Sequence, residues 1–292
     1  MIQNILEDIT SNKSKFIDND FAEIAYDESN MLVVLCHGFQ GSQYDMLTIM
    51  RSLKEMLPRA NYLLSRSNEG NTEGDIEAMG ERLSKEIKGY IHHYLDTEKA
   101  IINFIGHSMG GIIARCSLKH LNQEFSQQFG FFCSLSSPHL GYLNGVDSMI
   151  KAGLWMIKKF KPVQSLSQLS MEDHKNRRNT LIYRLSESGS LRNFRKIILL
   201  SSYEDSYVAW HSARILKHHS TKKNEAITIE SEMVEKILGN RPVHRIDVNF
   251  EVKEKNLDSF IGRTAHINLI VQESLFKIIN STLTELFDIT KQ

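Results

Sequence analysis

The sequence has few prolines, few cysteines and no long apolar run, and these absences narrow the class of protein. Four prolines and three cysteines occur in 292 residues. No stretch approaches the roughly 18 consecutive apolar residues that a membrane-spanning helix needs. The first residues, MIQNILEDIT, include acidic side chains and lack the continuous apolar stretch of a secretory signal. We therefore expect a soluble, cytoplasmic protein without a transmembrane segment.

The cysteines match neither a metal motif nor a disulfide framework. Cys36, Cys116 and Cys133 are odd in number, lack CxxC spacing and each lie inside an apolar run. Such cysteines behave as small buried hydrophobic side chains. We expect three free thiols in a reducing compartment, and we expect no metal ion and no cofactor.

The charge is balanced, which argues against a polyanionic partner. Lys and Arg number 35, Asp and Glu also 35, and the formal net charge is +0. A neutral chain has no overall field to hold nucleic acid. The short basic stretch at residues 217–223 (KHHSTKK) is interpreted as a solvated loop, so no nucleic-acid partner is expected.

Apolar patterns predict strands that alternate with helices. Continuous apolar runs predict six strands that are buried on both faces, at residues 31–36, 61–65, 100–105, 129–135, 196–201 and 243–250. Helical spacing of apolar residues predicts helices at 44–56, 75–94, 112–121 and 268–287. This alternation is typical of an α/β protein with a doubly wound, mostly parallel sheet. Without repeats or linkers, residues 1–292 are expected to form one domain, with residues 1–30 as an N-terminal extension.

One segment interrupts the alternation. Residues of about 142–195 read as helix and loop, which is more than a simple crossover needs. Within it, residues 146–160 (VDSMIKAGLWMIKKF) combine apolar side chains with three lysines. Two interpretations stay open: a helix that covers the core, or a helical cap over an active site, in which Leu154 and Trp155 would line the pocket. The same helix is a candidate for peripheral contact with lipid.

The segment GHSMG at residues 106–110 indicates a nucleophile. It fits G-x-S-x-G, and it follows a predicted strand and opens a predicted helix near Met109. This strand–turn–helix context is what the nucleophile-elbow motif requires. Gly106 and Gly110 would leave room for the tight turn, and Ser108 would stand at a helix N-terminus, where backbone amides favour negative charge.

A nucleophilic serine of this kind needs two amides that face the developing oxyanion. One is expected from Met109, the residue after the nucleophile, and the other from the loop after an earlier strand. The turn HGFQG at residues 37–41 lies in that place. We predict that the Phe39 amide is the second donor, that Gly38 allows close approach and that His37 orients the loop.

An acid and a base should follow the serine in chain order. Glu204 and Asp205 come directly after the strand at 196–201, and their adjacency leaves both open as the acid. His266 is expected in a loop between the last strand and the last helix, where it would be the base. The imidazole would take the serine proton, and the carboxylate would fix its tautomer.

The chain resembles a known family in six segments. These segments are LVVLCHGFQGS, INFIGHSMGGIIAR, SLSSPHLGYL, GLWMIKKF, LLSSYEDSYVAWHSARI and IGRTAHI. Together they resemble the eukaryotic serine esterase family known as domain of unknown function 676, which are lipase-like α/β hydrolases. They resemble in particular the C-terminal hydrolase domain of the "family with sequence similarity 135" proteins.

The resemblance implies an α/β-hydrolase fold in which Ser108 is the nucleophile, Asp205 rather than Glu204 the acid and His266 the base. It also implies that residues 137–141, including Leu140, form a loop at the pocket rim, so that His139 is not a second catalytic histidine. Two departures are visible: the loop after the acid lacks a proline, and Gly111 replaces a common polar residue.

These observations predict a metal-independent carboxylic ester hydrolase that acts on lipid or other hydrophobic acyl esters through an acyl-enzyme. Two alternatives stay open. One is a catalytically silent scaffold or subunit with the same fold, and the other is a thioesterase or amidase with the same triad.

Overall fold

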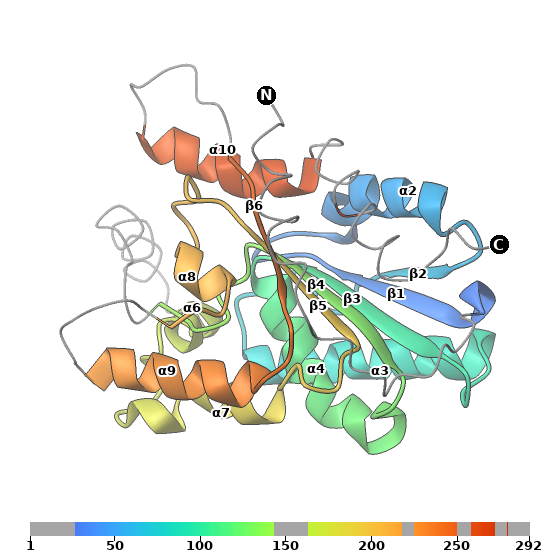
Figure 1. Ribbon diagram of the computed structural model, residues 1–292, viewed down its shortest axis with the longest axis horizontal. Helices are drawn as coiled ribbons and strands as arrows, with labels where there is room; N and C mark the ends of the chain where they lie inside the picture. Colours follow the sequence, from blue (N-terminus) through green and yellow to red (C-terminus); the bar gives the residue numbers. More distant parts are fainter. Residues whose placement is uncertain (1–26, 143–162, 218–224, 250–257, 272–278, 280–292) are drawn as a thin grey trace.

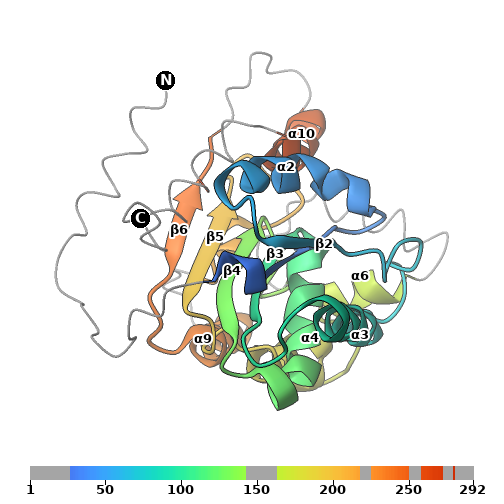
Figure 2. The same ribbon diagram turned by 90° about the vertical axis from the view of Figure 1, so that its right-hand side faces the viewer.

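The computed structural model describes residues 27–142, 163–217, 225–249, 258–271 and 279. Their arrangement is a central parallel sheet with helices on both faces (Figure 1). Viewed from the side, α2 (Leu47–Met56) and α10 (Asp258–Val271) cover one face (Figure 2). The other face is covered by α3 (Ile76–Tyr94), α4 (Met109–Phe125), α7 (Leu181–Ser188) and α9 (Glu225–Leu238).

The sheet has six parallel strands in the order β2-β1-β3-β4-β5-β6. The strands are β1 (Met31–Cys36), β2 (Asn61–Leu64), β3 (Ile101–His107), β4 (Phe129–Leu135), β5 (Lys196–Ser201) and β6 (His244–Asp247). Because all strands run the same way, their carboxyl ends meet at one edge, which is where such sheets bind ligands.

The two helix layers explain why β1 is apolar at every position. Val33 and Leu35 pack on the face that α2 and α10 cover, together with Ile49 and Leu269. The residues between them pack on the face that α3 and α4 cover. A strand that is buried on both faces reads as a continuous apolar run rather than an alternating one.

Shorter elements connect these layers. They are η2 (Glu28–Asn30), η3 (Gln43–Met46), α6 (Gln164–Leu169), η4 (Arg177–Asn179) and α8 (Trp210–Ala213). Both α6 and α7 lie in the predicted insertion at 142–195, and α7 packs against α4 and α9. This part of the insertion covers the core, whereas residues 146–160 lie outside the described residues.

The predicted doubly wound sheet is confirmed, and so are its six strands, with shifted bounds. One helix was predicted to begin too late, and one helix was missed. The last helix was expected over residues 268–287, but α10 begins at Asp258, and residues 272–278 and 280–287 lie outside the described part. No helix was predicted at α9, where Ile229, Met233 and Ile237 repeat every four residues on a buried face.

Two further expectations concern composition. All three cysteines are buried and free, as predicted, and burial raises the pKa of Cys116 and of Cys133 to about 12. None of the helices in the described ranges combines the length and apolar character that a membrane crossing requires.

Candidate active site

Ser108 occupies a strained turn at the carboxyl edge of the sheet. It follows β3 directly and caps α4, with φ of 54° and ψ of −127°. Its amide donates to the Leu135 carbonyl at 2.9 Å, so the ladder between β3 and β4 continues up to this residue. A non-glycine residue held at such angles costs on the order of 1–3 kcal/mol and marks functional sites more often than others.

The two motif glycines make this turn possible. A Cβ atom on Gly106 would lie 2.5 Å from the Gly111 backbone, and one on Gly110 would lie 2.2 Å from the Cys36 carbonyl oxygen. Backbone atoms at these distances cannot move aside cheaply, so both positions require glycine. A side chain at Gly111 would also be crowded, but by a side chain: its Cβ would lie 2.2 Å from Ser137 Oγ. The turn therefore has the geometry that the G-x-S-x-G pattern predicts.

The loop after β1 lies against this turn. A Cβ on Gly38 would lie 3.0 Å from Ser108 Cβ and 3.2 Å from the His107 carbonyl oxygen. The Gly41 amide donates to the Gly38 carbonyl at 3.1 Å, and His37 Nδ1 lies 3.0 Å from the same oxygen. These contacts place Gly38, the residue before Phe39, beside Ser108, within a loop that His37 helps to shape.

Asp205 is the best-held carboxylate at this edge. Its side chain is 0% exposed, and Oδ1 accepts the amides of Tyr207 at 2.7 Å and Val208 at 3.1 Å. The other oxygen, Oδ2, accepts from His266 Nδ1 at 2.7 Å and from Ser136 Oγ. Burial alone raises the pKa of Asp205, but the facing His266 and these donors outweigh burial and lower it. The group is therefore an ionised carboxylate at neutral pH.

Glu204, the adjacent candidate, faces elsewhere. Its carboxylate accepts from Ser202 Oγ at 2.5 Å, and its amide donates back to the same hydroxyl at 3.2 Å. Sequence adjacency left the two carboxylates open, and the structure brings only Asp205 to the imidazole.

His266 lies in α10, not in the loop that the sequence predicted. The segment continues as helix because Ala265, His266, Leu269 and Ile270 form one buried face, whereas Gly262 and its polar neighbours suggested a loop. Since an ionised carboxylate only accepts, His266 donates from Nδ1, and in the neutral imidazole this tautomer has no proton on Nε2. Among the described residues, no hydrogen bond joins His266 to Ser108 Oγ. Such bonds are often loose in free enzymes and tighten with substrate.

His107 links His266 to the turn that carries Ser108. Its ring centroid lies 4.7 Å from that of His266, and its Nε2 donates to the His266 carbonyl at 3.1 Å. Burial lowers the pKa of His107 to about 3, with a further contribution from His266. A neutral side chain therefore fixes α10 next to Ser108. This role could not be predicted from the sequence, because the position is the variable residue of G-x-S-x-G.

Ser136 was also missed, and no sequence signal marks it. It follows β4, is fully buried and has φ of 49°. The Tyr207 ring, 5.4 Å from that of His266, is a third neighbour of the site that the sequence analysis did not predict.

The remaining expected site residues lie apart from the reacting groups or outside the described residues. His139 is fully buried with Nε2 2.9 Å from Ser134 Oγ, and burial followed by the nearby Arg115 lowers its pKa well below the usual value. Leu140 is fully buried in the core on the α4 side. Leu154 and Trp155 lie outside the described residues. The pocket role of Leu140, Leu154 and Trp155 therefore stays a prediction.

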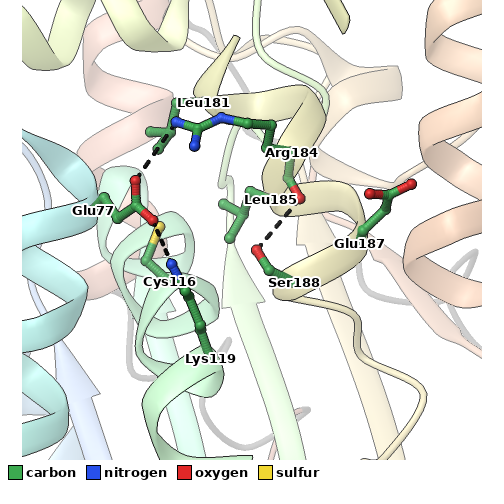
Figure 3. Close-up of a pocket in the computed structure, with 8 residues that line it drawn as sticks. All are labelled: Glu77, Cys116, Lys119, Leu181, Arg184, Leu185, Glu187 and Ser188. Atoms are coloured by element: carbon green, nitrogen blue, oxygen red, sulfur yellow. Dashed lines mark hydrogen bonds and ion pairs between the residues drawn. The ribbon is translucent and has the colours of Figure 1, made fainter. Parts of the chain in front are cut away.

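A separate cavity of about 410 Å³ opens between α3, α4 and α7 (Figure 3). Leu181, Leu185 and Cys116 contribute to its lining, and Glu77 pairs with Lys119 at 2.9 Å across one side. Cys116 lies about two helical turns along α4 from Ser108, and two turns span roughly 10 Å. Ser108, Asp205 and His266 are not among the residues that line this cavity. In the described ranges, no group of three or more His, Cys, Asp or Glu side chains is placed to hold a metal ion.

A serine on a strained strand–helix turn, with a carboxylate after β5 and a histidine after β6, defines an α/β-hydrolase fold. The chain belongs to the family described as "Putative serine esterase (DUF676)", whose model matches residues 27–220. The sequence-based assignment to this family is confirmed.

Individual relatives agree with this assignment. The chain is 27% identical over 204 residues to putative lipase YDL109C of Saccharomyces cerevisiae, which covers 65% of this chain and 31% of that protein. Putative lipase ROG1 of the same yeast is 26% identical over 201 residues, or 63% of this chain and 28% of that protein. The chain thus matches about a third of the length of these relatives. An esterase structure from Pyrococcus furiosus, Pf2001, covers 89% of this chain and is itself covered to 84%, with a TM-score of 0.51 and 17% identity, which supports the fold alone.

Proposed function

We propose that this protein is a serine hydrolase that cleaves carboxylic esters with a hydrophobic acyl group. Ser108 is the nucleophile, His266 the base and Asp205 the acid. The amides of Phe39 and Met109 stabilise the oxyanion. The observation that carries the proposal is the 2.7 Å hydrogen bond from His266 Nδ1 to the buried Asp205 carboxylate, next to a serine at φ 54°.

The proposed chemistry proceeds through an acyl-enzyme. Ser108 Oγ attacks the ester carbonyl carbon while its proton passes to His266 Nε2, and the oxyanion is held by the two amides. The imidazolium then returns this proton to the leaving alcohol as the carbon–oxygen bond breaks. Water attacks the acyl-enzyme by the same route, which releases the acid and restores the Ser108 hydroxyl. Throughout, Asp205 stabilises the imidazolium without taking its proton.

The substrate class rests on the family and on the sequence. Two yeast relatives carry the name putative lipase, and the segment at 146–160 is rich in apolar side chains that include Leu154 and Trp155. We therefore assign this segment as a cap that, with Leu140, accommodates a hydrophobic acyl chain and contacts lipid peripherally.

A fluorophosphonate probe tests the nucleophile. We expect the folded protein to be labelled and the Ser108→Ala variant to remain unlabelled while it unfolds at a similar temperature. Failure of the folded native protein to react would contradict the proposal and favour a silent scaffold.

A panel of p-nitrophenyl esters with acyl chains of increasing length tests the substrate. We expect kcat/KM to rise with chain length, since each buried methylene contributes about 0.8 kcal/mol. Matched acyl thioesters and anilides separate ester hydrolysis from thioesterase and amidase activity. If thioesters or anilides were cleaved faster than esters, Ser108, Asp205 and His266 would be assigned to thioester or amide hydrolysis instead.

A further inference from the structure

Two serines with left-handed backbone stand side by side at the carboxyl edge of the sheet. Ser108 follows β3 with φ of 54°, and Ser136 follows β4 with φ of 49°. Each continues its ladder for one residue, since the Ser108 amide donates to the Leu135 carbonyl and the Ser136 amide to the Leu200 carbonyl, both at 2.9 Å. Serine rarely adopts positive φ, and a residue that does so in a well-packed position points to a function. The proposed nucleophile accounts for the first serine only.

The Ser136 side chain explains the second. Its Oγ donates to Asp205 Oδ2, the same oxygen that accepts from His266 Nδ1. The opposite oxygen is already held by the Tyr207 and Val208 amides. A carboxylate offers about four acceptor positions, so these four donors fill it. Ser136 and the Asp205 side chain are both 0% exposed, so bulk water has no ready access to replace the hydroxyl.

We propose that Ser136 is a positioning residue for the acid and base: its hydroxyl shares Oδ2 with His266, fixes the carboxylate and limits how strongly the imidazole binds a proton. This inference rests on the proposed function, because the effect on catalysis requires His266 to be the base. A hydrogen bond to Oδ2 withdraws negative charge from the atom that stabilises the imidazolium. Without the Ser136 hydrogen bond, Oδ2 of Asp205 accepts a hydrogen bond from His266 alone. The imidazolium then becomes more stable, and the carboxylate is less constrained.

The other groups around the pair do not mask this effect. From β3, His107 faces His266 with a pKa that burial lowers to about 3, so it is neutral near pH 7. From the segment after β4, Tyr142 faces Asp205, and burial, followed by that carboxylate, raises its pKa. From the acid loop, the Tyr207 ring lies against His266. In the described residues, Asp205 is thus the charged group in contact with the imidazole.

Two substitutions separate the hydroxyl from the backbone. Ser136→Ala removes the hydroxyl and keeps the unfavourable φ, whereas Ser136→Gly removes the hydroxyl and relieves it. We expect both variants to lower kcat by about three- to tenfold with KM unchanged, because orientation of the imidazole matters in the transition state. Both should move the acidic limb of the kcat/KM profile to higher pH by roughly half a unit to one unit. The glycine variant should unfold at a higher temperature than the alanine variant.

Ser202→Ala is the matched control. Its buried hydroxyl also donates to a carboxylate of the acid loop, but to Glu204. We expect the acidic limb of this variant to coincide with that of the native protein. A purely structural role for Ser136 would instead lower the unfolding temperature of the alanine variant while both variants keep the native pH profile, and this result would overturn the inference.

A measurement without turnover distinguishes failure of this inference from failure of the proposed function. NMR of histidine-labelled protein gives the titration midpoint of His266, assigned by comparison with His266→Gln. We expect the midpoint to move to higher pH in both Ser136 variants, also in a Ser108→Ala background. An inactive, unlabelled native protein that shows this movement would refute the proposed function and retain the link between Ser136 and the pair. Identical midpoints in native and variant proteins would refute that link.

Discussion

Gly38→Ala tests whether the loop after β1 supplies part of the oxyanion site. A Cβ on Gly38 would lie 3.0 Å from Ser108 Cβ and 3.2 Å from the His107 carbonyl oxygen. Carbon atoms in favourable contact lie about 3.5–4.0 Å apart, so the loop and the serine must separate by about half an ångström or more. We expect this overpacking to lower the free energy of unfolding by about 1–2 kcal/mol, which leaves the protein folded.

The catalytic effect should exceed the effect on stability. Loss of one oxyanion donor reduces kcat by about 10²–10³. A donor that is only displaced, by about half an ångström, keeps part of its contribution. We therefore expect Gly38→Ala to lower kcat by about 10- to 100-fold, equivalent to about 1.4–2.7 kcal/mol of transition-state stabilisation. The assay is steady-state hydrolysis of a p-nitrophenyl ester, with thermal unfolding followed by circular dichroism.

Gly89→Ala provides the control, because it lies on the exposed side of α3 with no atom within 4 Å of its Cβ position. This change should leave kcat as it is and raise the free energy of unfolding by about 0.5–1 kcal/mol. A folded Gly38→Ala variant with native kcat would refute the assignment of this loop to the oxyanion site, and so would a loss confined to KM.

The remaining predictions concern stability. Gly110→Ala should prevent folding, because its Cβ would lie 2.2 Å from a backbone carbonyl oxygen of β1, and soluble expression with circular dichroism would show the loss. Arg115→Met should lower the free energy of unfolding by about 3–5 kcal/mol in denaturant titrations, because the fully buried guanidinium donates to three backbone carbonyls that would lose their partners. His107→Gln should reduce acid sensitivity. Since the pKa of His107 is about 3 in the folded protein and about 6.5 when unfolded, the unfolded state binds the extra proton as pH falls from 6.5 towards 3. The native protein should therefore lose about 2 kcal/mol at pH 5 relative to pH 7 through His107, and this part of the slope should vanish in the variant. If the pH dependence of stability were the same in the variant and the native protein, the pKa of His107 would not be lowered by folding.

The sheet could be predicted because its strands are buried on both faces. Each strand reads as a run of apolar letters, and the helices between them repeat with a different period. The end of β3 could not be predicted from the same rule. Gly106 and His107 interrupt the apolar run, yet they pair with Ser134 and Leu135 in the ladder. The length of β3 depends on its pairing with β4, and the sequence of β3 alone contains no information about that pairing.

The order of the proposed site residues followed from the motif, but the setting of His266 did not. A loop was predicted around His266 because Gly262, Arg263 and Thr264 resemble loop residues. In the structure these residues continue α10, since packing of Leu269 and Ile270 against the sheet outweighs the low helix propensity of one glycine. A polar side chain on the buried face also hid the helical period.

Ser136 and Arg115 show a different limit. Neither belongs to a motif whose chemistry is readable from spacing. The relevant properties are a backbone angle for Ser136 and three carbonyl partners for Arg115, of which Gly189 lies 74 positions away. Such properties exist only after the chain has folded.

The strand order makes the place of Ser136 understandable. β4 lies between β3, which carries Ser108, and β5, which leads to Asp205. Two strand spacings, about 9.6 Å, separate the end of β3 from the end of β5. The His266 imidazole, which α10 carries, contacts both sides: Nδ1 bonds Asp205, and the ring lies 4.7 Å from that of His107, the residue before Ser108. Ser136, the residue after β4, donates to the same carboxylate oxygen as His266. The strand between β3 and β5 thus ends beside the carboxylate, and a serine with φ of 49° occupies the position that reaches it.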